Sequence, residues 1–186
     1  MLVAIASGCG DSSAPATRTT AEKPDKRAKL PGDWRRVVNE RAGFNLGIPP
    51  GWRARGGPGS TIVRSRDKSL AVSITSDRSA AGRDLAVTTY ARRAIRGLRG
   101  YRDLKVGKVT RVVDTRYPAG AVKAEGVFER TSLRQALILF ALQKRRTGTF
   151  TMLVIRSARV PRGRYADVIS TMVRTLRSQP PRGGAR

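Results

Sequence analysis

Few residues in this chain could carry out chemistry. It has no histidine and one cysteine, Cys9, among 186 residues. Without histidine there is no Ser-His-Asp triad, no histidine general base and no imidazole metal ligand. A single cysteine excludes an intrachain disulfide and a thiolate zinc site. Composition alone therefore removes the commonest hydrolytic and metal centres.

Two other spacings could carry chemistry. Glu125 and Glu129 fall on one face of a predicted strand, about 13 Å apart, which is wider than a glycosidase carboxylate pair. Lys123 shares that face, so we expect a solvated salt-bridge ladder there. Ser65 and Lys68 have the spacing of a Ser-Lys dyad, but they lie in a predicted hairpin loop. We expect no catalytic residue, no metal site, no cofactor and no enzymatic activity.

Positive charge dominates the chain. Lys and Arg number 38 against 13 Asp and Glu, a net charge of +25, and nearly all of it lies in residues 34–178. Arg92, Arg96 and Arg99 lie on the outer face of a predicted helix, where we expect a solvent-facing surface. The alternative is an anion-binding surface for a polyanion. Aromatic residues are only 5% and do not alternate with basic ones, so no specific nucleic acid is expected as a partner.

The aromatic residues at the start of the charged segment suggest a core. Trp34, Phe44 and Trp52 lie close together in sequence. A glycine-rich stretch follows, over residues 56–60, and it lacks the Lys-Ser/Thr of a phosphate-binding loop. We expect core packing and a flexible loop; the alternative is a binding cleft formed by Trp52, Gly56 and Gly57.

Cys9 follows a short apolar run and three small residues, Ala6, Ser7 and Gly8. This pattern resembles the lipobox of bacterial lipoproteins, which implies lipidation of the Cys9 thiol after cleavage of residues 1–8. Ala6 stands where leucine is usual, and no basic residue precedes the apolar run. We therefore expect the true start of translation to lie upstream of Met1.

Composition divides the chain into four segments. Residues 1–8 are a residual signal and lipobox segment, and 9–33 form a tether rich in Ser, Thr, Ala, Pro and Lys that cannot bury enough apolar surface to fold. Residues 34–178 form one folded domain, and 179–186 a disordered tail. The longest apolar run after the N-terminus, residues 136–142, is far too short to span a membrane.

Hydrophobic periodicity predicts strands and two helices within the domain. Alternating patterns place strands at residues 34–39, 44–48, 61–66, 70–75, 104–114, 121–130, 134–144 and 149–157. One helix starts at Asp84 as its N-cap and stops at Gly100, and a second covers residues 165–176. The unbroken apolar run 136–142 predicts a central strand covered on both faces. Strands in runs with hairpin-length links predict an α+β domain with an antiparallel sheet of seven or eight strands, covered by two main helices.

These features resemble a known fold. A lipobox, a Phe-containing strand that closes in Pro49, Gly51 and Trp52, a hairpin, a helix, an antiparallel meander and a last helix are similar to the PsbP-like fold, as in actinobacterial lipoproteins of the LpqN type. The resemblance covers residues 34–178. Such proteins are mostly accessory or binding proteins, so it implies a fold and no shared active site.

The sequence thus predicts an extracytoplasmic lipoprotein, anchored to the cell membrane through Cys9, with a non-enzymatic binding domain. Another envelope protein or an anionic polymer is the expected partner. The alternative is a polyanion-binding protein that uses its basic surface on acidic lipid, wall polymer or nucleic acid.

Overall fold

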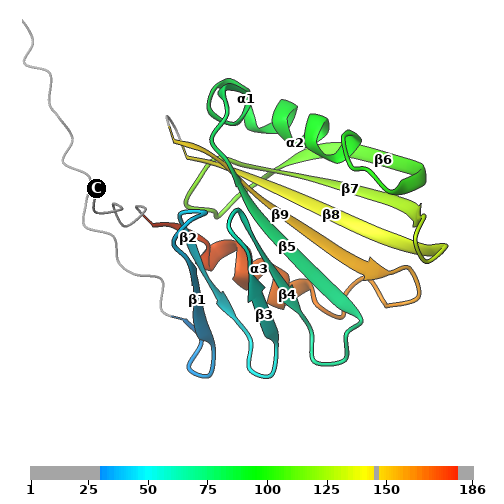
Figure 1. The fold of residues 1–186 in the computed structure, drawn as a ribbon, viewed down its shortest axis with the longest axis horizontal. Coiled ribbons are helices and arrows are strands. Elements are labelled where there is room, and N and C mark those ends of the chain that lie inside the picture. Colours follow the sequence, from blue (N-terminus) through cyan, green and yellow to red (C-terminus); the bar gives the residue numbers. More distant parts are fainter. Residues whose placement is uncertain (1–29, 145–146, 180–186) are drawn as a thin grey trace, which may run out of the picture.

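The strands of the computed structural model form two antiparallel sheets (Figure 1). The structure describes residues 30–144 and 147–179. The larger sheet has seven strands in the order β3-β4-β5-β9-β8-β7-β6, and the smaller has the order β1-β2-β10. The larger sheet consists of β3 (Arg53–Gly56), β4 (Ser60–Arg64), β5 (Leu70–Asp77), β6 (Tyr101–Val112), β7 (Ala119–Phe128), β8 (Leu133–Lys144) and β9 (Gly148–Ser157). The smaller sheet consists of β1 (Arg35–Asn39), β2 (Phe44–Ile48) and β10 (Arg177–Ser178).

Each face of the larger sheet has its own apolar core. On one face, α2 (Val87–Arg96) buries Tyr90 and Ile95 against Leu137 and Leu139 of β8. On the other face, α3 (Ala166–Thr175) and β2 pack against β5 and β9. In Figure 1, α2 and α3 accordingly lie on opposite sides of the sheet. The predicted α+β domain with an antiparallel sheet is confirmed.

Strand β8 is the central strand that the apolar run 136–142 predicted. It lies between β7 and β9, within the seven-stranded sheet. Leu137 and Leu139 belong to the core under α2, while Ile138 and Phe140 pack against the core under α3. The absence of alternation in this run therefore reflects burial on both faces.

The first predicted helix was wrong at both ends. Asp84 is the last residue of a separate short helix, α1 (Ala80–Asp84), whose N-cap is Ser79. Leu85 has an extended backbone and separates α1 from α2. Helix α2 ends at Arg96, with Gly97 as its C-cap. Tyr101 does not continue the helix; it is the first residue of β6 and pairs with Phe128 of β7. Leu98 and Tyr101 still pack against the core under α2. The three- and four-residue spacing of the apolar residues therefore indicated which side chains are buried, and not how long the helix is.

The strand predictions also need correction. The short β3 and β10 were not predicted, because neither contains an alternating apolar pattern. The expected strand 61–66 is β4, which starts at Ser60 and ends at Arg64. The expected strands 104–114 and 121–130 are β6 and β7, and both start and end two or three residues earlier than predicted. The glycine-rich stretch 56–60 is the tight link between β3 and β4, with Gly57 donating a backbone hydrogen bond to Ser60.

The described residues at the two ends of the chain contact the domain. Leu30 is half-buried, and Gln179 donates a backbone hydrogen bond to Gly43 over 2.8 Å. Both residues fall just outside the predicted bounds of 34 and 178. Cys9, the remainder of the predicted tether and the tail from residue 180 lie outside the described residues.

Candidate ligand-binding groove

A groove runs along the α3 face of the larger sheet, beside α3. It consists of two adjoining cavities, which share Lys123, Ile138 and Arg162. The first, which we call the cationic cavity, encloses about 440 Å³, and the second, which we call the apolar cavity, encloses about 350 Å³. Cavities of this size hold small organic ligands.

Strand register places the charges of the cationic cavity. Lys105 of β6 lies opposite Glu125 of β7, Glu125 opposite Ala136 of β8, and Ala136 opposite Arg156 of β9. Directly opposed residues project from the same face, so these four form one row across the sheet. Lys123 lies two residues along β7, opposite Ile138, and shares the face of Glu125.

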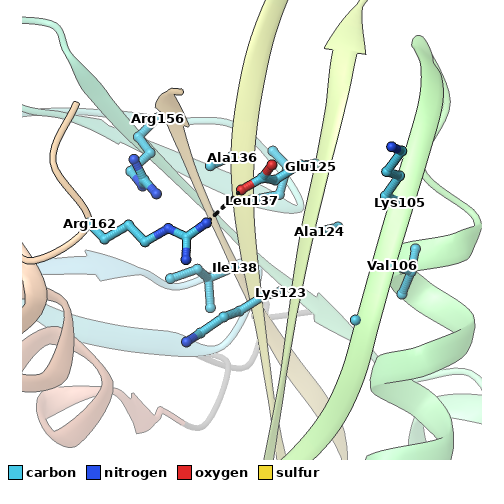
Figure 2. Close-up of a pocket in the computed structure, with 11 residues that line it drawn as sticks. Lys105, Val106, Lys123, Ala124, Glu125, Ala136, Leu137, Ile138, Arg156 and Arg162 are labelled. Atoms are coloured by element: carbon cyan, nitrogen blue, oxygen red, sulfur yellow. Dashed lines mark hydrogen bonds and ion pairs between the residues drawn. The ribbon is translucent and has the colours of Figure 1, made fainter. Parts of the chain in front are cut away.

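Arg162 completes the cationic cavity from the loop between β9 and α3. Its guanidinium forms an ion pair with Glu125 over 3.3 Å, while its side chain stays 86% exposed. Figure 2 shows Arg162 reaching toward Glu125, with Arg156 beside it and Lys105 across the strands. Lys105 and Lys123 make no hydrogen bond or ion pair within the described part of the chain, so both ammonium groups are available to an anion.

Glu125 and Glu129 do not form the salt-bridge ladder that was expected with Lys123. Glu125 pairs with Arg162, a residue from a distant loop, and not with Lys123 of its own strand. Glu129 follows the end of β7, and its backbone N–H donates to Gly100. The two carboxylates therefore do not act as a pair.

The apolar cavity lies between α3 and the sheet. Its apolar lining comes from β8, α3, the end of β6 and the residue after it: Val112, Val113, Ile138, Phe140, Ala166, Ile169 and Val173. Val113 is 77% exposed, although most large apolar side chains of the described residues are covered. Asp114, Thr115, Ser170 and Arg174 supply the remaining polar edge. Cations therefore line both cavities, and the second differs from the first in the apolar wall that α3 adds.

The β4–β5 turn holds the loop that carries Arg162. Asp67 in that turn accepts a hydrogen bond from the Tyr165 hydroxyl over 2.7 Å and pairs with Arg164 over 3.0 Å. Ser65 donates to the same carboxylate over 2.6 Å. The hydrogen bonds from Ser65 and Tyr165 hold the pKa of Asp67 well below its usual range. A charged Asp67 therefore fixes one end of the loop at neutral pH.

This turn also contains the Ser65–Lys68 spacing. The Ser65 hydroxyl contacts Asp67 and the Leu70 backbone, and Leu70 N–H donates back to it. Lys68 lies in the turn with φ of 58° and is exposed. The serine therefore has a structural role in closing the hairpin.

Arg92, Arg96 and Arg99 are exposed on and just after α2. They lie on the opposite face of the sheet from the groove. Exposed arginines also occur on β1, β3 and β4, so positive charge is spread over several faces of the domain. The predicted anion site on this helix stays a prediction.

The predicted cleft residues lie in unlike surroundings. Trp52 is only 8% exposed and packs edge-on against Tyr165, with ring centroids 5.8 Å apart. Gly56 and Gly57 are exposed at the end of β3. The Gly57 carbonyl accepts a hydrogen bond from the Asn39 side chain over 3.0 Å. Core packing thus accounts for Trp52, and the cleft stays a prediction.

A third cavity, of about 410 Å³, lies between the ends of β5, β8 and β9 and Gln179. Among the described residues, three cations line it, Arg78, Arg83 and Lys144, and all three donate hydrogen bonds to other groups of the chain. Lys144 donates to Ser178 over 3.0 Å, and Arg78 donates to the Ala42 carbonyl over 3.4 Å. This cavity is a weaker candidate for an anion than the groove.

Within residues 30–144 and 147–179, no group of acidic or cysteine side chains could hold a metal ion. No helix there has the length and apolar character needed to cross a membrane.

Sequence reasoning missed the groove as a site. Its residues come from β6, β7, β8, β9, a loop and α3, and only the pairing register brings them together. The one local signal is Lys123-Ala124-Glu125, where charged residues interrupt an otherwise apolar strand. That signal places charge on the α3 face of β7 but does not reveal Arg156 or Arg162.

Comparison with solved structures defines the fold as Mog1/PsbP-like. The Ran-binding protein Mog1p of Saccharomyces cerevisiae gives a TM-score of 0.54 at 8% identity, covering 79% of this chain and 96% of that one. Cyanobacterial PsbP (CyanoP) of Synechocystis gives 0.51 at 13% identity, covering 81% of this chain and 97% of that one. At these identities the likeness shows the fold alone.

A protein from Bacteroides thetaiotaomicron gives a TM-score of 0.55 at 13% identity over 79% of this chain. This chain spans about half of that protein, 49% of its length. LpqN of Mycobacterium tuberculosis, described as involved in cell envelope biogenesis, gives only 0.38 at 12% identity, over 85% of this chain and 88% of that one. The likeness to LpqN therefore carries no argument.

The sequence itself gives no comparable match. It matches no family model and no curated protein sequence. The predicted PsbP-like fold is thus confirmed by structural likeness, while the narrower LpqN-type assignment stays a prediction.

Proposed function

We propose that this protein is a membrane-anchored, extracytoplasmic lipoprotein whose Mog1/PsbP-like domain acts by binding and not by catalysis. The observation that carries the binding role is the groove, where two adjoining cavities join cations to an apolar lining. An exposed ion pair between Glu125 and Arg162 connects the loop to the sheet. A concave site that combines an apolar lining with a few polar groups is typical of ligand binding.

The anchor rests on the sequence around Cys9. Three small residues precede the single cysteine, and a segment rich in Ser, Thr, Ala, Pro and Lys follows it. A thiol in that context is the group that takes a diacylglyceryl chain in bacterial lipoproteins. A lipid on Cys9 would keep the domain, which follows about 25 residues later in the chain, near the membrane surface.

The alternative function is general polyanion binding by the basic surface. A net charge of +25 raises the local concentration of any polyanion. However, the exposed arginines occupy both faces of the sheet and several strands. This distribution favours a diffuse positive field and argues against a dedicated polyanion site. Diffuse binding is independent of sequence and weakens steeply with salt. We therefore rank it below ligand binding in the groove.

The test of the anchor is cell fractionation of Cys9→Ser, with Ser13→Ala as a matched control. We expect the wild-type protein and Ser13→Ala to remain in the membrane fraction and to incorporate an alkyne-labelled fatty acid. Cys9→Ser should lose both properties, with the thermal unfolding midpoint unchanged. Retention of Cys9→Ser in the membrane at high salt, or no label on the wild type, would refute lipid anchoring through Cys9.

A further inference from the structure

We infer that the groove binds a single-chain amphiphile with one anionic headgroup. The headgroup occupies the cationic cavity, and the chain lies in the apolar cavity against α3. This inference deepens the proposed binding function and rests on it. It concerns the ligand class alone and does not depend on the anchor at Cys9.

The headgroup site follows from the balance of charge. Four cations line the cationic cavity, namely Lys105, Lys123, Arg156 and Arg162, and one carboxylate, Glu125, opposes them. Glu125 is already paired with Arg162. Arg156 donates to the Val160 carbonyl and is held by the loop. Lys105 and Lys123 make no such bond among the described residues, so an incoming anion finds two free ammonium groups beside two guanidinium groups.

The chain site follows from the lining of the second cavity. Ile138 belongs to both cavities, and Phe140 lies two residues further along β8. The run from Ala136 to Phe140 extends about 13 Å along the strand, which suits a medium-length alkyl chain. Ile169 and Val173 form the opposite wall on α3, and the exposed Val113 lies at the mouth. A cavity of about 350 Å³ has room for one chain.

An acidic peptide fits this groove less well. An extended peptide gains most of its affinity from backbone hydrogen bonds to a free strand edge. The floor of the groove is β7 and β8, and each is paired with a strand on both sides. Strand β6 also lines the groove and is an edge strand, but its unpaired side is the one away from β7 and so away from the floor. The floor therefore offers side chains and no free ladder.

A polyanion also fits poorly. A polymer with many phosphates or carboxylates needs an unbroken row of cations. Here Glu125 interrupts the cationic cavity, and Asp114 lies on the edge of the apolar cavity. One negative charge with an apolar tail matches the groove better than a chain of charges.

The test is calorimetric titration of the full chain with alkyl phosphates below their micellar concentrations, at physiological salt. Binding should strengthen by up to about fourfold for each added methylene from hexyl to decyl phosphate, until the chain fills the cavity. Inorganic phosphate should bind at least about a hundredfold more weakly than decyl phosphate. A zwitterionic alkyl phosphocholine of equal chain length should bind about tenfold more weakly.

Two double variants with the same change in charge distinguish binding in the groove from attraction by the overall positive charge. Lys123→Gln/Arg162→Gln should weaken decyl phosphate binding at least about tenfold. Arg92→Gln/Arg96→Gln removes the same charge from the far face and should leave binding within about twofold. Equal losses for the two pairs, or equal affinity for inorganic phosphate and decyl phosphate, would overturn the inference.

A second pair of variants tests the chain site. Ser170 is exposed on α3 and lines the apolar cavity, so Ser170→Trp should fill it without disturbing the core. Thr89→Trp places the same bulk on an exposed position of α2. Ser170→Trp should lose at least about tenfold in affinity and Thr89→Trp less than about twofold. If Ser170→Trp unfolds, Ala166→Trp, also exposed and lining the cavity, takes its place.

Full affinity in the tryptophan variant would show that the chain does not enter the apolar cavity. If no alkyl phosphate binds while Cys9→Ser still leaves the membrane, the ligand class is wrong and the anchored lipoprotein stands. If binding is as expected while Cys9→Ser stays in the membrane, the anchor is wrong and the ligand class stands.

Discussion

Thr175→Val tests how the groove wall is attached to the rest of the fold. Thr175 is the last residue of α3 and is 4% exposed. Its hydroxyl donates to the Met172 carbonyl over 3.0 Å and accepts the Gly47 N–H of β2 over 3.1 Å. Strand β10 pairs with β2 only at Phe44 and Asn45, so this hydroxyl satisfies a buried N–H that β10 does not reach.

The magnitude follows from that single buried donor. Valine keeps the shape of threonine and has nearly the same helix propensity. The variant leaves the Gly47 N–H without a partner, and Gly47 is itself buried. An unsatisfied buried donor costs about 1–3 kcal/mol. For a domain of this size, we expect the unfolding midpoint to fall by about 3–10 °C.

The assay is thermal and urea unfolding of the variant beside Thr171→Val. Thr171 lies one turn earlier on α3, is half-buried, and its hydroxyl accepts only from Arg174 over 3.4 Å. The control should change stability by less than about 0.5 kcal/mol. Equal changes in the two variants would show that the Thr175 hydroxyl does not attach α3 to β2.

Two further predictions concern charge. Because the pKa of Asp67 is lowered in the folded state, its stabilisation is complete above the ordinary carboxyl pKa and is lost as pH falls through the folded pKa. The difference in unfolding midpoint between wild type and Asp67→Asn should thus be constant from pH 7 to about pH 5 and shrink below it; a difference that grows in acid contradicts this. DNA should bind weakly at low ionic strength and be mostly released near physiological salt in a filter-binding assay. Replacement by Gln should cause equal losses for two sets of arginines, 92, 96 and 99 on one side and 53, 55 and 64 on the other, whereas a much larger loss for the first set would reveal a dedicated site on α2.

Elements with a strong hydrophobic pattern could be predicted from the sequence. Strand β8 was predicted because seven consecutive apolar residues can be buried only between two layers. Helix α3 was predicted because its apolar residues recur at three- and four-residue steps before the prolines at 180 and 181. The order of strands and helices then indicated an antiparallel α+β fold.

Elements that depend on tertiary contacts could not be predicted. Strand β3 reads Arg-Ala-Arg-Gly and forms only because β4 pairs with it. The break between α1 and α2 occurs at Leu85, which adopts an extended backbone. Neither a glycine nor a proline marks this position, so the sequence does not indicate the break.

The groove depends on strand register. Lys105 comes opposite Glu125 only after an irregularity in β6 between Arg102 and Lys105. No spacing along the chain encodes such a shift. Charged residues from β6, β7, β9 and the following loop are therefore brought together by the fold and by nothing local.

The most direct test of the central claim is an NMR map of amide shifts during titration with decyl phosphate. Binding in the groove should move the amides of Lys123, Ile138, Phe140 and Ser170 and leave residues 90–95 of α2 unchanged. Ile138 and Phe140 lie in β8 and Ser170 in α3, so concerted shifts in both elements would place the ligand between them. Shifts of equal size on α2, or shifts spread over every exposed arginine, would contradict a ligand site beside α3.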